Sequence, residues 1–373
     1  MSRTPKKVLG GRESVKVAIV QKGPVFMDRA GSIDRARDLI KEAADAGAEL
    51  VAFPEVWLCG YPYWTEGWDT PMEKWAAGRA IFREAAILAP SEDTKAIGEA
   101  ARDAGVYVSI GCNEIDERPE SETIYNTLLL FGRDGALIGK KRKLVPTFIE
   151  RVFWGQGDEN DLQVWETDIG RIGALICGEN LMPLARSALM AQGEDIHLAV
   201  FPGAFRIHTG PMLEELDEDG SAFWGHVSVR QHAMEGCCFV VSACGYIEDA
   251  DIGADFPYRE NMNTNYAKGG SSVIAPLGVP LVPPTIGSQI LYADLQAWMI
   301  KTWSAIMDTQ GHYARNDLLR LQVRKGDRWS AAGSSASAAP GTVRRSVLRQ
   351  AAEEHGVDPD IAEKIAETAE LLR

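Results

Sequence analysis

The 373-residue sequence lacks an apolar run long enough to cross a membrane, because its longest apolar runs have only the length of a β-strand. Residues 1–12 are polar and basic, and they lack the apolar stretch that a secretory signal requires. Both absences argue against a membrane protein and against a secreted one. We therefore expect a cytoplasmic protein that does not bind a membrane.

Cysteine is also scarce. The six cysteines are irregularly spaced, which does not fit a disulfide framework. No Cys-x-x-Cys pair indicates a zinc site or thioredoxin-like redox chemistry. Histidine, cysteine and aspartate do not cluster as metal ligands anywhere in the sequence. We therefore expect no metal and no other cofactor.

Basic residues are outnumbered by acidic ones. The counts are 39 Lys and Arg against 53 Asp and Glu, a formal net charge of -14 at pH 7. Binding to phosphate groups depends on a basic surface, so we expect no nucleic-acid partner. One basic cluster, 140–143, needs a local explanation, and by itself it is equally consistent with a solvated strand end.

Several catalytic and nucleotide-binding motifs are missing. The sequence has neither Gly-x-Gly-x-x-Gly nor Gly-x-x-x-x-Gly-Lys, so nucleotide binding has no support. It also lacks the Gly-x-Ser-x-Gly elbow of serine hydrolases. The catalytic chemistry, if there is any, must come from other residues.

A repeated pattern of helix, glycine and apolar strand indicates an α/β fold. A segment with helical spacing of apolar residues ends at a glycine and leads into a short apolar run. The pattern occurs four times, with the strand in 50–53, 106–110, 196–201 and 237–243. Such alternation is typical of sheets that are covered by helices.

Two segments have the character of antiparallel hairpins. The β-rich runs 123–131 and 136–143 are joined by the turn sequence Gly-Arg-Asp-Gly at 132–135. The runs 270–275 and 289–295 flank a Gly/Pro-rich stretch, which predicts a second hairpin at a sheet edge.

The composition changes near the C-terminus. We expect an N-terminal arm at 1–14, one catalytic domain at 15–325, a flexible linker rich in Ala, Ser and Gly at 326–342, and a charged helical tail at 343–373.

The segment that best fits a catalytic nucleophile surrounds Cys177. The apolar run 172–176 stops at this cysteine, and a helical segment, 181–192, follows with Pro183 in its first turn. A thiol at a strand-to-helix elbow lies near the helix N-terminus, which favours the thiolate. Considered alone, the segment favours a buried, unreactive cysteine, because free cysteine is among the most buried residue types.

Two other ionisable residues stand at the ends of predicted strands. Glu55 follows the run 50–53 after Pro54, and Lys143 ends the hairpin strand. A carboxylate can accept a thiol proton, and an ammonium group can balance negative charge that develops on a substrate. Each residue alone is equally well explained as a cap or a surface side chain.

Together these segments resemble the nitrilase superfamily of carbon–nitrogen hydrolases. The sequence Phe-Pro-Glu at 53–55, with Gly-Tyr-Pro at 60–62, is similar to the family's glutamate motif. The sequence Arg-Lys-Leu-Val-Pro-Thr at 142–147, with Trp-Gly-Gln-Gly-Asp at 154–158, is similar to its lysine motif. Cys-Gly-Glu-Asn at 177–180 is similar to its cysteine motif. The resemblance runs from about residue 15 to residue 323 and omits the tail.

The resemblance implies a four-layer αββα sandwich and a role for each matching residue. Glu55 would be the general base, Lys143 the cationic stabiliser and Cys177 the nucleophile. Glu150 would be a second carboxylate that orients the lysine or the substrate. The family also implies a homo-oligomer, a dimer or a larger and sometimes spiral assembly.

The sequence at 154–158 resembles true nitrilases more than amidases or carbamoylases. We therefore expect hydrolysis of a small organic nitrile to the carboxylic acid and ammonia, through a cysteine thioimidate and thioester. Tyr61, Trp64, Trp154 and Gly178 are the expected substrate contacts. Gly178 departs from the tryptophan that usually follows the nucleophile, so a large wall of the pocket is missing.

Two alternatives remain open. An amidase or carbamoylase would act on a small amide C–N bond with the same residues. A catalytically silent assembly protein would keep the sandwich and its interfaces but not the reaction.

Overall fold

The computed structural model describes residues 7–65, 71–204 and 224–323. Within these ranges the strands form two six-stranded sheets, with the orders β12-β1-β2-β3-β4-β5 and β11-β10-β9-β8-β7-β6. The first sheet consists of β1 (Ser14–Gln21), β2 (Leu50–Ala52), β3 (Tyr107–Ile115), β4 (Ile124–Phe131), β5 (Leu137–Arg142) and β12 (Gln289–Gln296). The second consists of β6 (Val164–Thr167), β7 (Gly170–Ile176), β8 (Ile196–Phe201), β9 (Phe239–Cys244), β10 (Gly269–Ile274) and β11 (Pro280–Ile286).

The two sheets have the same internal plan. In each, three neighbouring strands are parallel, namely β1-β2-β3 and β7-β8-β9. Antiparallel strands flank them on both sides. The carboxyl ends of the parallel strands lie at one edge of each sheet, which is where α/β folds place functional residues.

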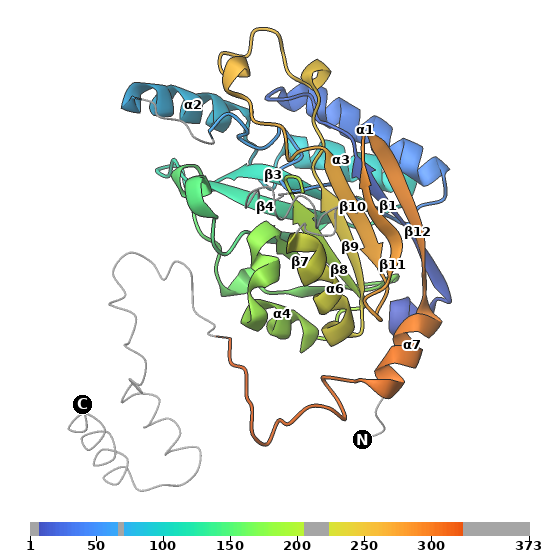
Figure 1. The fold of residues 1–373 in the computed structure, drawn as a ribbon. Coiled ribbons are helices and arrows are strands. Elements are labelled where there is room, and N and C mark those ends of the chain that lie inside the picture. Colours follow the sequence, from blue (N-terminus) through green and yellow to red (C-terminus); the bar gives the residue numbers. More distant parts are fainter. Residues whose placement is uncertain (1–6, 66–70, 205–223, 324–373) are drawn as a thin grey trace, which may run out of the picture. The chain divides into compact units, whose positions relative to one another are not determined.

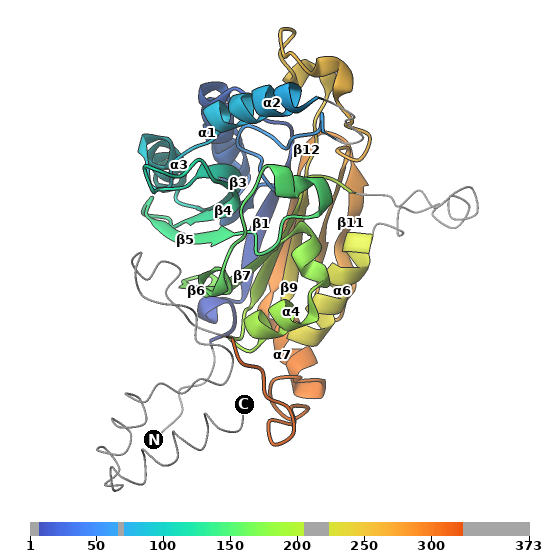
Figure 2. The same cartoon turned by 90° about the vertical axis from the view of Figure 1, so that its left-hand side faces the viewer.

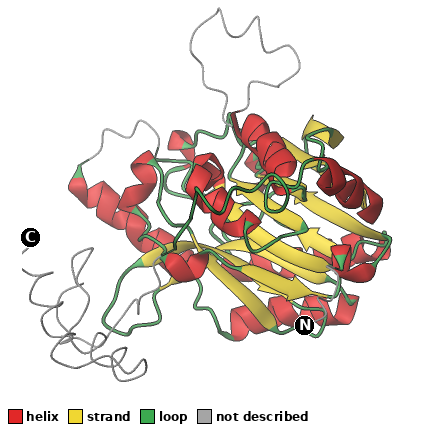
Figure 3. Cartoon of the chain, turned by 90° about the horizontal axis from the view of Figure 1, so that it is seen from below, coloured by secondary structure: helices red, strands yellow, loops and turns green. Residues whose placement is uncertain are grey.

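Helices cover the outer face of each sheet. The helices are α1 (Arg29–Asp45), α2 (Met72–Ala85), α3 (Glu92–Ala104), α4 (Pro183–Met190), α6 (Trp224–Gly236) and α7 (Ala297–Ile306). Figures 1 and 2 show α1 and α3 on one side of the strands and α4 and α6 on the other. Seen from below, the strands lie between helices (Figure 3). The predicted αββα sandwich is confirmed.

Two large apolar clusters hold these layers together. One joins the sheets face to face, with residues such as Val17 and Leu128 from the first sheet and Leu198 and Val241 from the second. The other packs α1 and α3 onto the first sheet, for example through Leu39. Apolar burial of this kind is the main favourable term in folding, and here it also fixes one sheet against the other.

The repeated helix-to-strand units fold as the sequence predicts. In α3, Ser91 and Thr94 form a reciprocal cap at the N-terminus. The helix ends at Gly105, whose φ of 67° lies in the left-handed region that favours glycine. The chain then enters β3. The hairpin of β4 and β5 is also present, with an antiparallel register.

The second predicted hairpin is wrong. β10 pairs with β11, which is formed by the Gly/Pro-rich stretch itself. β12 crosses to the other sheet and pairs along its whole length with β1. β11 is an edge strand, so it tolerates Pro280, Pro283 and Pro284. Proline has no backbone N–H group, and at a sheet edge this removes few of the hydrogen bonds between strands.

Smaller elements complete the described chain. The 3₁₀ helices are η1 (Val8–Gly11), η2 (Phe148–Val152), η3 (Glu159–Asp161), η4 (Cys177–Leu181), η5 (Asp249–Asp251) and η6 (Arg259–Asn261). Among the described residues, no helix is both long and apolar enough to cross a membrane. The predicted linker and helical tail lie outside the described residues.

Candidate active site

The predicted nucleophile lies in a strained elbow between β7 and η4. Cys177 has a φ of 53°, which a residue with a side chain rarely adopts. The Asn180 side-chain amide donates to the backbone carbonyls of Leu175 (3.2 Å) and Cys177 (3.0 Å). Strain of this size persists only where the surroundings hold it, and such positions cluster at functional sites. The expected helix at 181–192 is shorter than predicted, because α4 begins only at Pro183.

The predicted general base is buried after β2. Glu55 Oε1 accepts hydrogen bonds from Asn126 Nδ2 (2.6 Å) and Lys143 Nζ (2.8 Å). Its other oxygen, Oε2, has no hydrogen-bond partner within the described part of the chain. One carboxylate oxygen is thus fixed in place while the other remains available to accept a proton.

Lys143 contacts two carboxylates. Its ammonium group lies 2.8 Å from Glu55 Oε1 and 2.7 Å from Glu150 Oε2, and all three side chains are buried. Glu150 belongs to η2 and also accepts from the Tyr61 hydroxyl at 2.9 Å and from the Thr147 backbone N–H at 2.7 Å. Glu150 is therefore held on three sides and fixes the lysine in turn.

These side chains converge on the thiol. One oxygen of Glu55, one oxygen of Glu150 and Cys177 Sγ all lie within 4.8 Å of one another. Glu55 and Lys143 come from the first sheet and Cys177 from the second. The structure thus brings together all four residues to which the sequence assigns a catalytic role.

The charges in this cluster shift its pKa values. Burial raises the pKa of Glu55 to about 7, with Glu150 adding to the rise while Lys143 and Asn126 oppose it. Burial alone would lower the pKa of Lys143, but Glu55, Cys177 and Glu150 raise it well above its usual value. The raised pKa of Lys143 favours its charged form, and a pKa of about 7 for Glu55 is suited to proton transfer near neutrality.

The thiol differs from the sequence-based expectation. Burial raises the pKa of Cys177 well above its usual value, and Glu55 and Glu150 add to the rise while Lys143 and the Gly178 backbone N–H oppose it. The predicted preference for the thiolate is wrong, because desolvation and two carboxylates outweigh the contribution of the Gly178 backbone N–H. A raised pKa favours the neutral thiol over the thiolate.

The basic cluster at 140–143 is buried structure rather than a binding surface. Lys140 and Arg142 both pair with Glu114, at 2.8 Å and 2.6 Å. Lys141 pairs with Glu179 at 3.0 Å. Each positive charge in the cluster therefore has a carboxylate partner inside the protein.

The expected substrate contacts fall into different environments. Tyr61 hydrogen-bonds Glu150, and Trp154 Nε1 donates to Asn113 Oδ1 at 2.8 Å. Trp64 is fully buried among aromatic rings, including a stacked ring of Tyr258 at 6.1 Å. These contacts show positioning and packing roles, and direct contact of these three side chains with substrate stays a prediction.

Sequence reasoning missed Asn126, which holds the general base. It is a buried amide within the otherwise apolar strand β4. A polar residue in an apolar run was the available signal, since buried polar groups need partners.

A second buried cluster could be taken for a metal site. Glu194 accepts from His197 at 2.9 Å and contacts His232 at 2.5 Å, and His197 Nε2 lies 3.2 Å from Asn180 Oδ1. The two imidazole rings are stacked, with centroids 3.7 Å apart. The lone pairs of imidazole nitrogens lie in the plane of the ring, so two stacked rings direct them side by side and not toward one metal position. The cluster fits a hydrogen-bond network that supports Asn180 better than it fits metal coordination.

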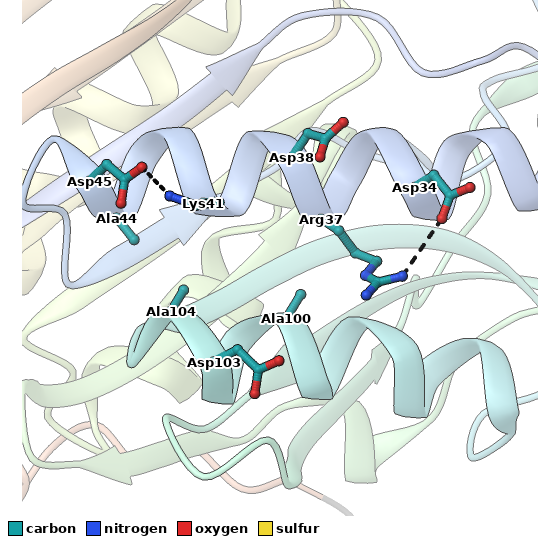
Figure 4. A pocket seen from close by; sticks show the side chains of 9 residues that line it. All are labelled: Asp34, Arg37, Asp38, Lys41, Ala44, Asp45, Ala100, Asp103 and Ala104. Atoms are coloured by element: carbon teal, nitrogen blue, oxygen red, sulfur yellow. Dashed lines mark hydrogen bonds and ion pairs between the residues drawn. The ribbon is translucent and has the colours of Figure 1, made fainter.

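A surface groove lies elsewhere, between α1 and α3. Its volume is about 690 Å³, and its lining includes Asp34, Arg37, Lys41 and Asp45. Figure 4 shows that these charged side chains pair with one another across successive helical turns. None of the four catalytic candidates lines this groove, so it is not the reaction site.

The comparisons with known proteins agree with this geometry. A carbon-nitrogen hydrolase family model matches residues 16–305. The chain belongs to the carbon–nitrogen hydrolase family. It is 38% identical over 317 residues to a nitrilase of Paraburkholderia phymatum, covering 83% of this chain and 86% of that relative. It is 36% identical over 339 residues to nitrilase 1 of Arabidopsis thaliana, covering 88% and 92%. These relatives place this carbon–nitrogen hydrolase in the nitrilase branch.

Solved structures of the family support the fold. Saccharomyces cerevisiae Nit3 superposes with a TM-score of 0.64 at 22% identity, covering 83% of this chain and 99% of that one. A carbon–nitrogen hydrolase of Helicobacter pylori gives 0.64 at 18% identity, covering 82% and 97%. At such identities the likeness establishes the sandwich of this hydrolase and not its substrate.

The raised pKa of Glu55 predicts how thiol reactivity depends on pH. A base must be unprotonated to accept a proton, so alkylation of Cys177 by iodoacetamide should accelerate as the pH rises through about 7. Asn126→Leu removes a hydrogen bond that lowers this pKa, so the midpoint should move to higher pH. Peptide mapping by mass spectrometry at a series of pH values measures both midpoints. An unchanged midpoint in the variant would contradict this account of Glu55.

Proposed function

We propose that this hydrolase converts a small organic nitrile to the carboxylic acid and ammonia. The observation that carries the proposal is that Glu55, Glu150 and Cys177 lie within 4.8 Å of one another, with the buried Lys143 ammonium group paired to both carboxylates. Relatives that are named nitrilases support the choice of a nitrile over an amide. No cofactor is part of the proposal.

The first half of the reaction forms a covalent intermediate. Glu55 Oε2 takes the proton of the Cys177 thiol while the sulfur adds to the nitrile carbon. The nitrile nitrogen gains electron density in this step, and Lys143 stabilises it before Glu55 returns the proton. The product is a thioimidate. Because Lys143 is already held by two carboxylates, it meets this charge without reorganisation.

The second half releases ammonia and then the acid. Glu55 takes a proton from water and passes it to the nitrogen while the water oxygen adds to the thioimidate carbon. Glu55 then moves the remaining proton of that oxygen to the nitrogen, the C–N bond breaks, and ammonia leaves behind a thioester. A second water hydrolyses the thioester, returning the thiol and giving the acid. Expulsion of the sulfur instead would give an amide. We expect acid as the main product, because Glu55 can protonate the departing nitrogen.

Substitution of the catalytic side chains tests the assignment. Cys177→Ala should abolish nitrile turnover, and Glu55→Gln should be nearly as damaging because an amide cannot take the thiol proton. Lys143→Ala should lower kcat by several orders of magnitude if the lysine acts on the transition state. Ammonia release, with acid and amide quantified by chromatography, measures these effects. Cys237→Ala is the matched control, since Cys237 is also buried and has a positive φ of 48°.

The same assay separates the alternatives. Faster turnover of the matching amides than of the nitriles would make the protein an amidase or carbamoylase. Amide as the dominant product would indicate nitrile hydration, an activity named for a bifunctional relative in Lupinus angustifolius that is 35% identical. Absence of both turnover and alkylation at Cys177 would favour a silent assembly protein.

Gly178 should set the size of the substrate. Apart from its chain neighbours and its own helix backbone, a Cβ atom built there meets only Thr147 Oγ1 among the described atoms within 4 Å, at 3.2 Å. Gly178→Ala should therefore keep near-normal kcat/KM. Gly178→Trp should lower kcat/KM for bulky nitriles far more than for small ones, because the larger side chain fills space beside the nucleophile. Equal losses for both substrate sizes would show that Gly178 does not border the substrate.

We also propose that the protein acts in the cytoplasm as a homo-oligomer, a dimer or larger. The support is the family resemblance alone. Light scattering of the full-length chain should give a mass of at least two chains, and a monomeric mass would contradict the oligomeric state. Cell fractionation tests the location.

A further inference from the structure

The carboxylate of Glu179 takes no part in the reaction steps above, yet it is buried beside the nucleophile. It lies in η4, two residues after Cys177. Its Oε2 accepts from the Ile176 backbone N–H at 2.6 Å, and its Oε1 accepts from the Leu144 backbone N–H at 2.5 Å. The Lys141 ammonium lies 3.0 Å from the same carboxylate.

The positions of these partners are informative. Ile176 is the residue immediately before the nucleophile, and Leu144 is the residue immediately after Lys143. β7, which ends at Ile176, belongs to the second sheet, while β5, which leads to Lys143, belongs to the first. Glu179 therefore links the two chain segments that carry the thiol and the ammonium group.

Helix capping explains only part of this arrangement. A glutamate at the third position of a helix often accepts from the N–H of the cap residue, and the bond to Ile176 has that form. The bonds from Leu144 and Lys141 reach another sheet and cap nothing. Hydrogen bonds of this kind, with an ionised acceptor, are stronger than those between neutral groups.

We propose that Glu179 is a positioning residue that sets the separation between the Lys143 ammonium group and the Cys177 thiol. Its single carboxylate accepts from the Ile176 amide, at the end of a strand of the second sheet, and from the Leu144 amide, which follows a strand of the first sheet. The buried Lys141 ammonium group balances its charge. Displacement of the Ile176 amide would move Cys177, and displacement of the Leu144 amide would move Lys143. The kcat readout below rests on the proposed function, whereas the alkylation readout does not.

Glutamine cannot replace this carboxylate. The amide keeps one acceptor oxygen, but its NH₂ group would face either a backbone N–H or the Lys141 ammonium, which are all donors. Glu179→Gln therefore releases one of the two segments. Lys143 lowers the pKa of the Cys177 thiol, so a longer separation between them should also raise that pKa.

The experiment compares Glu179→Gln with Asp195→Asn in the full-length chain. Asp195 is a matched control because it is a buried carboxylate that accepts from the Arg171 backbone N–H at 3.0 Å, near the start of the same strand β7. Glu179→Gln should lower kcat about 100-fold, the effect of a small misplacement, with little change in KM. Its rate of Cys177 alkylation by iodoacetamide should fall about tenfold and its pH profile should shift upward. Asp195→Asn should change only thermal stability.

Several results would overturn the inference. A folded Glu179→Gln protein with normal kcat and alkylation would do so, and so would equal losses in both variants. If Glu179→Gln does not fold, Glu179→Asp keeps the charge on a side chain one methylene shorter. It should show a smaller loss of the same kind, and normal kcat and alkylation in it would refute the role. Wild-type protein that is alkylated at Cys177 but turns over no nitrile would refute the proposed function alone. The comparison of alkylation rates would then still decide the role of Glu179.

Discussion

The buried contact between Lys143 and two carboxylates is the constraint on which the site depends. An ammonium group removed from water is costly unless it is paired and hydrogen-bonded. Glu55 and Glu150 supply the pairing at 2.8 Å and 2.7 Å. Each carboxylate is in turn fixed by a neutral donor, Asn126 for Glu55 and Tyr61 for Glu150. Loss of Lys143 would leave two buried carboxylates without the cation that pairs with both.

This cluster exists only because two sheets face each other. The first sheet supplies the base and the cation, and the second supplies the thiol. Neither half carries a complete set of reacting groups. The apolar core between the sheets therefore positions the site as well as stabilising the fold, because it holds Glu55, Glu150 and Cys177 from separate chain segments within 4.8 Å of one another. Close packing at this interface resists the small shifts that would separate them.

Burial and the neighbouring charges change the pKa values of both the thiol and Glu55. With one cation between two carboxylates, the cluster cannot also stabilise a free thiolate, and the pKa of the Cys177 thiol is raised. The same surroundings raise the pKa of Glu55 to about 7, so this carboxylate can accept and return a proton near neutrality. In the proposed reaction, burial of Cys177 therefore requires Glu55 to accept the thiol proton as the sulfur attacks the substrate.

Local sequence determined the helix-to-strand units, as at α3 and Gly105, because caps, glycines and apolar periodicity act over a few residues. It also placed Glu55, Lys143 and Cys177 at the ends of predicted strands, and the family resemblance of the surrounding motifs added Glu150. Only the tertiary structure decided that β12 pairs with β1, that Asn126 hydrogen-bonds Glu55, that Glu179 contacts segments of both sheets and that the pKa of the Cys177 thiol is raised. Strand pairing, hydrogen bonds and desolvation depend on segments that are far apart in the sequence and meet only in the folded chain.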